Sequence, residues 1–249
     1  NDVWVRDNGP IFVINESDGS LAIINWKFNG WGKKSKYKEC NEIPSLVAAQ
    51  LNLPAYSVPM VNEGGSIEVD GRGTLMAKSS SILNKNRNPG WTREDAERYF
   101  TRYLGVTNFI WLDGKKGGDI TDDHIDGTAR FAHGDAIATF YRKDFEDPRE
   151  YDILAAAKDV NGKPYRIVSL PVTTKKIAKL NDYGVYTNYY VGNRVLLMPT
   201  YNDPSDVIVK QILADLYPER NVIGILSTQL YKDGGILHCV TQQQPATQK

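Results

Sequence analysis

A recurring order of strand, turn, strand, helix and strand restricts how this chain can fold more than any other feature of its sequence. The order returns at a spacing of very roughly 50 residues, without a close sequence repeat. Its helices are clearest at residues 92–104 and 204–216, which are followed by apolar strands at 108–112 and 221–226. The pattern predicts a structurally repeated α/β fold whose loops gather at one end and carry the functional residues.

Capping and turn residues predict where these elements begin and end. Thr92 and Asp95 have the spacing of a capping box, and Gly105 can end that helix. Asp203 can cap the later helix, with Pro204 as its first residue. Apolar runs separated by turn formers predict hairpins at 11–14 with 21–26, 128–132 with 136–141, and 183–190 with 194–199. Further helices are predicted at 44–51 and 148–158.

Composition limits the classes of partner. The chain has 249 residues, and its 30 basic side chains equal its 30 acidic ones, so it lacks the basic surplus expected of a nucleic-acid binder. No apolar run approaches the length of a membrane span. Its two cysteines, Cys40 and Cys239, do not make a disulfide framework, which favours a reducing compartment. Three histidines are too few and too poorly spaced for a zinc signature, and no metal site is expected.

The segment around Cys239 allows two interpretations. Gly234 and Gly235 precede it and permit a ligand to approach the backbone closely, so the thiol could be a positioned nucleophile. Free cysteine is also among the most buried residue types, so the same thiol could be structural. This segment alone does not separate the two interpretations.

Four polar clusters in glycine-marked loops, one of which holds both His124 and Asp126, suggest a joint chemistry. A thiolate at Cys239 would be a strong nucleophile, and His124 could exchange protons near neutral pH. Of the carboxylates Asp7, Glu63 and Asp126, one could orient the histidine, and the two others are best explained by a cationic, planar substrate. Carboxylates accept the fork of donors on a guanidinium, so Asp7 and Asp126 could grip its two edges and hold its carbon over the thiol.

Each of these residues also has an ordinary structural interpretation. Asp7 could form a surface ion pair with Arg6, and Glu63 could be a turn residue. The acidic run at 119–126 could be solvated, or could form a calcium loop, although the ligand spacing of an EF-hand is absent. His124 alone could be a structural histidine. The catalytic interpretation depends on the combination of residues.

Five motifs together resemble one family. In chain order they are WVRDNGP (4–10), NEGGSI (62–67), NRNP (86–89), TDDHID (121–126) and GGILHCVTQQQP (234–245). They are similar to the agmatine deiminases, a family that includes bacterial peptidylarginine deiminases and belongs to the guanidino-group-modifying pentein superfamily. The resemblance implies an α/β fold, a five-bladed propeller with pseudo-fivefold symmetry and a central pocket. It covers residues 1–249 as one catalytic domain, in which an N-terminal module usual in the family is expected to be missing.

The resemblance also implies residue roles. Cys239 would be the nucleophile, His124 the acid and base, and Asp7 with Asp126 the guanidinium clamp. Glu63 matches an acidic residue that orients the histidine in wider relatives.

Two further residues would contact the substrate, Trp4 as a wall of its channel and Gly235 as a point of close backbone approach. The family usually carries Gly or Ser at the position of Asp123, and often Asn at that of Leu237, and both departures bear on substrate preference.

The implied reaction is hydrolysis of agmatine to N-carbamoylputrescine and ammonia through a covalent thiouronium, without metal or organic cofactor. This reaction belongs to polyamine (putrescine) biosynthesis and implies a cytoplasmic enzyme whose partner is the small cationic substrate, with no nucleic acid and no membrane. A homo-oligomer is compatible with the sequence. The main alternative is a peptidylarginine deiminase, which would be secreted or periplasmic. A non-catalytic binder of cations and an amidinotransferase are weaker alternatives.

Overall fold

One structural unit recurs along the chain in the computed structural model, which describes residues 2–246. Within these residues, four three-stranded sheets have the same topology. The first two strands of each sheet pair antiparallel, and a helix then leads to a third strand that pairs parallel to the second. The recurring order predicted from the sequence is therefore confirmed.

The bounds of the four units are as follows. The first comprises β1 (Ile11–Ile14), β2 (Leu21–Lys27), α3 (Ile43–Leu51) and β3 (Ala55–Val61), and the second β4 (Ile67–Val69), β5 (Thr74–Lys78), α5 (Arg93–Leu104) and β6 (Asn108–Leu112). The third comprises β7 (Ala129–Ala132), β8 (Ala136–Phe140), α6 (Pro148–Ala156) and β9 (Arg166–Leu170), and the fourth β12 (Tyr190–Val191), β13 (Val195–Thr200), α7 (Ser205–Leu216) and β14 (Asn221–Leu226).

Short elements connect the units. They are the helices α1 (Val5–Asn8), α2 (Gly30–Lys33), α4 (Ser79–Ile82) and α8 (Thr228–Lys232), the 3-10 turns η1 (Cys40–Glu42), η2 (Gly64–Ser66), η3 (Ile125–Gly127) and η4 (Arg142–Asp144), and the hairpin of β10 (Lys176–Ile177) with β11 (Asp182–Tyr183). In residues 2–246 no helix combines the length and the apolar composition needed to cross a membrane.

Local chemistry explains the clearest helix boundaries. The Thr92 hydroxyl accepts from the Asp95 backbone N–H, and the Asp95 carboxylate accepts from the Thr92 N–H, so the predicted capping box is present. Gly105 follows α5 with a φ of 70°, a left-handed conformation that glycine adopts at low cost. α7 begins at Ser205 with Pro204 in the N-cap position, one residue later than predicted, although the Asp203 carboxylate still accepts from the Ser205 N–H.

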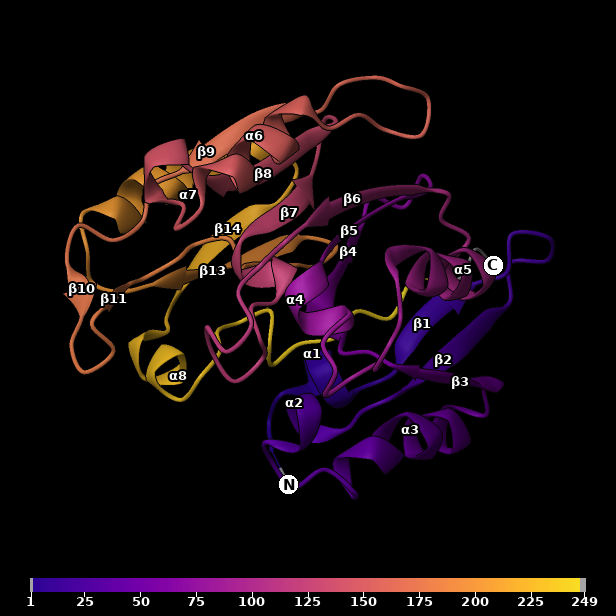
Figure 1. Ribbon diagram of the computed structural model, residues 1–249. Helices are drawn as coiled ribbons and strands as arrows, with labels where there is room; N and C mark the ends of the chain where they lie inside the picture. Colours follow the sequence, from indigo (N-terminus) through magenta and orange to yellow (C-terminus); the bar gives the residue numbers. More distant parts are fainter. Residues whose placement is uncertain (1, 247–249) are drawn as a thin grey trace.

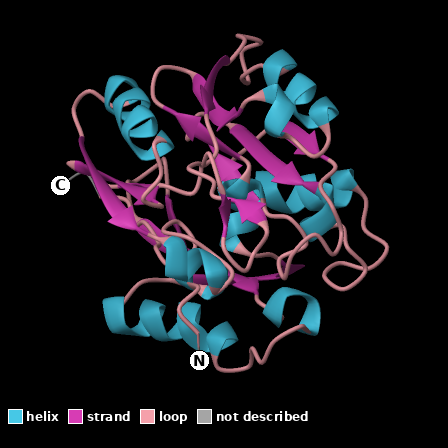
Figure 2. Cartoon of the chain, turned by 90° about the vertical axis from the view of Figure 1, so that its left-hand side faces the viewer, coloured by secondary structure: helices cyan, strands magenta, loops and turns pink. Residues whose placement is uncertain are grey.

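Neighbouring units share apolar cores. Met60 of the first unit and Phe100 of the second lie in one buried cluster, and Met76 of the second unit lies in another with Ile137 of the third. A third cluster joins the third and fourth units. Full burial of a side chain such as Phe100 contributes roughly 1.5–3 kcal/mol. This shared burial fixes each unit against the next, with most helices on the outside and strands further in (Figure 2).

Functional segments occupy equivalent places in the repeat. α1 precedes β1, η2 precedes β4, η3 precedes β7, and Asn188 stands just before β12. In Figure 1 the C-terminal segment, drawn in yellow, passes beside α1 near the middle of the molecule. The backbone N–H of Arg6 donates to the carbonyl of Cys239 at 3.1 Å, so the first and last motifs are joined directly.

The strand predicted at 183–190 is wrong. Only its ends are extended, as β11 and the two-residue strand β12. Between them the four consecutive side chains of residues 186–189 are buried, whereas a half-buried strand alternates inward and outward positions. The Tyr186 hydroxyl donates to Asp206, the Thr187 hydroxyl donates to the Gly127 carbonyl, and Asn188 reaches the cysteine. These polar contacts require an irregular backbone.

Candidate active site

Cys239 faces a cavity. The cavity has a volume of about 850 Å³, and His124, Asp126, Asn188 and Gly235 also line it. The sulfur lies 3.5 Å from Oδ1 of Asn188 and 3.8 Å from Oδ2 of Asp126. Cys40, the other cysteine of the sequence, is buried in a separate apolar cluster. The two thiols therefore differ in access to a ligand.

His124 is buried among carboxylates. Its Nε2 lies 3.4 Å from Oε2 of Glu63, and its Nδ1 lies 3.6 Å from Oδ1 of Asp7. Burial lowers the pKa of this imidazole, but Asp7, Glu63 and Asp126 outweigh that effect and raise the pKa to about 9. At neutral pH the ring is therefore an imidazolium that can donate a proton.

Asp126 stands between the cysteine and a second histidine. Its Oδ2 is 2.7 Å from Nδ1 of His238, and both side chains are buried. Burial raises the pKa of Asp126 to about 6, with Asp7 adding to the rise and His124 opposing it. The group therefore remains largely ionised at neutral pH and becomes neutral in moderately acidic solution.

Asp7 is held from two sides. Trp31 Nε1 donates to Oδ2 at 2.8 Å, and the Gly65 N–H donates to Oδ1 at 3.0 Å. Burial raises the pKa of Asp7, with Glu63 adding to the rise and His124 opposing it. The alternative of a surface ion pair with Arg6 is wrong: Arg6 is also buried, and it donates to the His238 carbonyl and to the side chains of the C-terminal segment.

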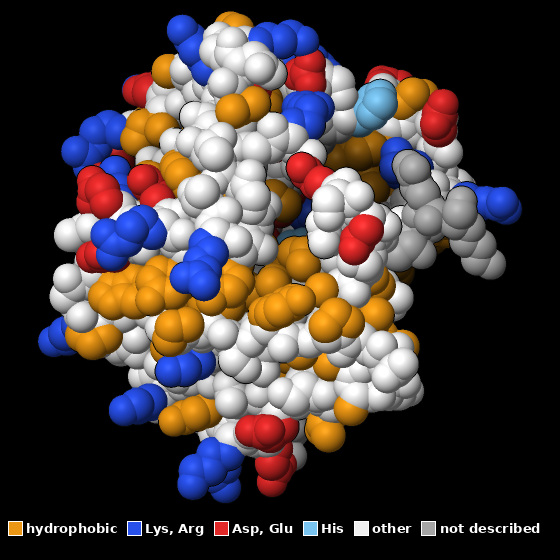
Figure 3. Space-filling view, turned by 90° about the vertical axis from the view of Figure 1, so that its right-hand side faces the viewer, with side chains coloured by type: hydrophobic (Ala, Val, Ile, Leu, Met, Phe, Trp, Pro, Cys, Tyr) orange, Lys and Arg blue, Asp and Glu red, His pale blue; other side chains and the backbone are white. Residues whose placement is uncertain are grey.

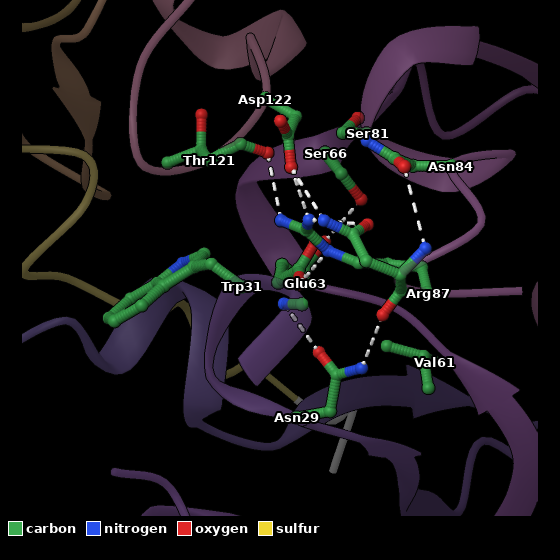
Figure 4. Close-up of polar contacts among 12 residues, drawn as sticks. Asn29, Trp31, Val61, Glu63, Ser66, Ser81, Asn84, Arg87, Thr121 and Asp122 are labelled. Atoms are coloured by element: carbon green, nitrogen blue, oxygen red, sulfur yellow. Dashed lines mark hydrogen bonds and ion pairs between the residues drawn. The ribbon is translucent and has the colours of Figure 1, made fainter. Parts of the chain in front are cut away.

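Glu63 binds an arginine with the oxygen that does not face His124. Arg87 Nε donates to Oε1 at 2.9 Å, and both side chains are shielded from solvent. Figure 4 shows the guanidinium between Glu63 and Asp122. Glu63 is therefore not a solvated turn residue, because its carboxylate joins a buried cation to the active-site imidazole.

Two glycines make space that a side chain would fill. A Cβ at Gly65 would lie 2.8 Å from both Asp7 Oδ1 and His124 Nδ1, and 3.0 Å from Asp126 Oδ2. A Cβ at Gly235 would lie 2.4 Å from Cζ3 of Trp4. Trp4 therefore packs directly on the backbone beside the cysteine, although it does not line the cavity itself.

The free site holds the thiol in its protonated form. Burial raises the pKa of Cys239 well above its ordinary value, and the negative charges of Asp126 and Asp7 raise it further. A cation placed between these carboxylates would reverse the electrostatic part of this effect. The site therefore favours a positively charged ligand over a neutral one.

All seven residues predicted for the site come together around Cys239, but the sequence interpretation missed three that contact them. These are Asn188, His238 and Arg87. Asn188 could have been found from the repeat, since it occupies the place before β12 that Asp126 occupies before β7. Nothing in the residue pattern indicates that the motif NRNP supplies a partner for Glu63. Among residues 2–246, no three His, Cys, Asp or Glu side chains are arranged to hold a metal ion.

Comparison with known proteins agrees with this geometry. A dimethylarginine dimethylaminohydrolase matches 95% of this chain and 74% of its own with a TM-score of 0.54 at 14% identity, a likeness of fold alone. The repeated units and the cysteine–histidine–carboxylate site define a protein with a pentein-type fold. The model of the Porphyromonas-type peptidyl-arginine deiminases matches residues 1–245, and the chain belongs to that family.

The similar relatives include agmatine deiminases. That of Pseudomonas syringae pv. tomato is 34% identical over 99% of this chain and 75% of its own length, and that of Pseudomonas savastanoi pv. phaseolicola is 34% identical over 100% and 76%. The structure of the Enterococcus faecalis agmatine deiminase has a TM-score of 0.87 at 25% identity and covers 97% of this chain and 74% of that one.

Proposed function

We propose that this protein is an agmatine deiminase, which hydrolyses agmatine to N-carbamoylputrescine and ammonia and serves polyamine biosynthesis. The observation that carries the proposal is a thiol at the wall of a cavity, 3.8 Å from a buried carboxylate, with a buried imidazolium lining the same cavity. The agmatine deiminases among its relatives support the same reaction.

The guanidinium is bound by Asp126 and Asp7. Asp126 lines the cavity beside the sulfur, and its second oxygen, Oδ1, accepts no hydrogen bond from the described residues. Asp7 already accepts two protein donors, but each carboxylate oxygen has two lone pairs and can accept another. Bidentate hydrogen bonds from a planar cation fix its orientation and place its carbon over Cys239.

The chemistry divides into two additions. The guanidinium cation lowers the pKa of Cys239, which releases its proton to solvent, and the thiolate then attacks the central carbon and forms a tetrahedral adduct. The His124 imidazolium protonates the departing nitrogen, ammonia leaves, and an S-alkylthiouronium remains. Neutral His124 then removes a proton from water, which attacks the same carbon, and collapse releases the ureido product and the thiolate. Glu63 orients the imidazole at both stages, and Gly235 contacts the substrate, with Trp4 packed behind its backbone.

Charge around the cavity favours agmatine over a peptide. Acidic side chains outnumber lysines in its lining, and Lys78 and Lys115 are already paired with lining carboxylates. Asp119, Asp144 and Asp182 also line it and form no ion pair with any described residue. Agmatine carries a second positive charge on its amine, which this lining attracts, whereas an arginine within a peptide has no second charge and free arginine adds a carboxylate that the lining repels. Asp123, the departure from the family motif, is neutralised by Lys78.

The finer architecture that we propose is one catalytic domain built as a propeller of five units around the site. Each of the four sheets described is open, and β14 exposes Ile223, Ile225 and Leu226. Figure 3 shows a band of hydrophobic side chains across the face of the molecule that lies on the right in Figure 1. The reaction requires no metal or organic cofactor, and polyamine synthesis would place the enzyme in the cytoplasm.

Purified protein offered agmatine, free arginine or an arginine-containing peptide tests the function. We expect ammonia and a ureido product from agmatine, and loss of turnover in Cys239→Ser. Cys40→Ala, which removes the other thiol, should retain turnover. Turnover of the peptide in place of agmatine would favour the peptidylarginine alternative, and no turnover of any of the three would refute the proposal.

A further inference from the structure

Arg87 belongs to the motif NRNP (86–89), to which the reaction above gives no role. The loop that carries it is fixed by its neighbours: Asn88 Nδ2 donates to the carbonyls of Val61 and Ile82, and Asn88 Oδ1 accepts from the Val61 N–H. Asn29 Nδ2 donates to the Asn86 carbonyl at 2.9 Å. These contacts hold the backbone of Arg87 beside the C-terminal end of β3, and Glu63 follows that end along the chain.

The guanidinium of Arg87 is completely buried and joins two segments of the active site. Its Nε donates to Glu63, its Nη1 forms an ion pair with Asp122, and its Nη2 donates to the Thr121 carbonyl at 2.9 Å (Figure 4). Asp122 also binds Lys34 at 2.8 Å, and Lys34 and Arg87 contribute to holding the pKa of Asp122 at about 2 although burial opposes them. One rigid fork therefore contacts both carboxylates.

Both segments lead to His124. Glu63 contacts its Nε2 directly, and Asp122 and Asp123 precede it with φ values of 64° and 73°, in a left-handed conformation that is costly for residues other than glycine. The contacts of Arg87 with Thr121 and Asp122 hold this strained turn in place. A buried carboxylate that loses its cation is strongly destabilised, so Glu63 would turn away or take up a proton without Arg87.

We infer that Arg87 is a positioning residue for the proposed reaction. It fixes the position of the His124 imidazole by binding the Glu63 oxygen that faces away from it and by binding the turn at residues 121–123. The inference rests on the proposed function. Arg87 does not line the cavity, so it acts only through these partners. The ordinary alternative is an arginine that stabilises the fold and has no effect on the imidazole.

The variant Arg87→Met removes the charge and keeps much of the volume. We expect it to lower kcat by about 10- to 100-fold, the range typical of residues that orient a reactive group, while KM changes little. Arg87→Lys can pair with one carboxylate but not bridge both, and should recover part of the loss. In a Glu63→Gln background Arg87→Met should lower kcat by a much smaller factor than in the wild type, because both substitutions disrupt the same ion pair.

NMR titration of the histidines gives a readout that needs no turnover. The chain has three, and His133 serves as an internal reference. We expect the titration midpoint of His124 to fall in Arg87→Met, because Glu63 no longer presents a fixed negative charge, and to recover in Arg87→Lys. Leu213→Ala, at a fully buried position of α7, provides a destabilised control that should leave His124 unchanged.

An unchanged or raised midpoint in a folded Arg87→Met protein, or additive losses of kcat in the double variant, would overturn the inference. Failure of the proposed function is recognised separately, because the wild type would then not release ammonia from agmatine. The titration result would still decide whether Arg87 controls the titration midpoint of His124.

Discussion

His238 Nδ1 lies 2.7 Å from Asp126 Oδ2 in the buried interior of the site. Burial lowers the pKa of His238 well below its ordinary value, and the nearby charges of Arg130 and Arg6 lower it further, so the ring is neutral. A neutral imidazole that carries its proton on Nδ1 donates to this carboxylate. The residue next to the proposed nucleophile therefore orients the anion that binds the substrate.

Removing this donor should weaken binding. We expect His238→Ala to raise KM for agmatine by about 10-fold, since loss of a buried hydrogen bond to a charged group costs about 1–3 kcal/mol. His238→Asn can present an amide N–H near the position of Nδ1 and should retain most of the affinity. Equal losses in both variants, measured by steady-state kinetics, would argue against a role for the donated proton.

Substrate binding should depend on pH through Asp126. Its pKa is raised to about 6, so the clamp is anionic above that pH and neutral below it. KM should therefore be constant near pH 8 and rise as the pH falls through about 6. In Asp126→Asn, KM should be high and free of this dependence. A KM that is flat from pH 5 to 8 in the wild type would contradict the assignment.

Gly65→Ala should inactivate the protein without unfolding it. The added methyl group would press on Asp7, His124 and Asp126 at 2.8–3.0 Å, so these groups must separate. We expect kcat to fall by about 100-fold, as small displacements of reacting groups can cause. Gly127→Ala is the matched control, because a Cβ there meets no atom within 4 Å. Circular dichroism should show both variants folded.

Thiol labelling should distinguish reagents by charge. Because the pKa of Cys239 is raised by burial and by Asp126 and Asp7, neutral iodoacetamide should react slowly at pH 7, whereas a cationic haloacetamidine should react fast. Asp126→Asn should speed the first reaction and slow the second. Mass spectrometry of the labelled peptide separates Cys239 from Cys40. A parallel change in both rates would mean that Asp126 does not act electrostatically.

Short-range rules predicted much of the fold. The capping box of Thr92 and Asp95 and the stop at Gly105 depend on residues a few positions apart, and the sequence displays such signals directly. The strand predicted at 183–190 failed because Asn188 and its neighbours are fixed by contacts with η3 and Cys239, far along the chain. The alternation of apolar and polar residues along a segment does not depend on those distant contacts and therefore cannot predict them.

The sequence predicted the chemistry of the candidate site, but not the residues that hold its reactive groups in place. A lone cysteine, a histidine and surplus carboxylates in glycine-marked loops indicate a cationic substrate before any distance is known. Arg87 and His238 carry no such signal, since their importance comes from atoms across the fold that they contact. Such partners become visible only when the loops are assembled in space.

The hydrogen bonds between Arg6 and the C-terminal motif also affect how the protein folds. Arg6 and His238 are separated by 232 positions, and closing so long a loop is slow compared with forming a hairpin. While the chain is still on the ribosome, Asp7 and Asp126 are made well before the thiol that they lie beside in the folded protein. The Cys239 thiol would therefore become reactive toward a cationic reagent abruptly and late in folding. The moment at which this reactivity appears would show, in a single assay, when folding is complete.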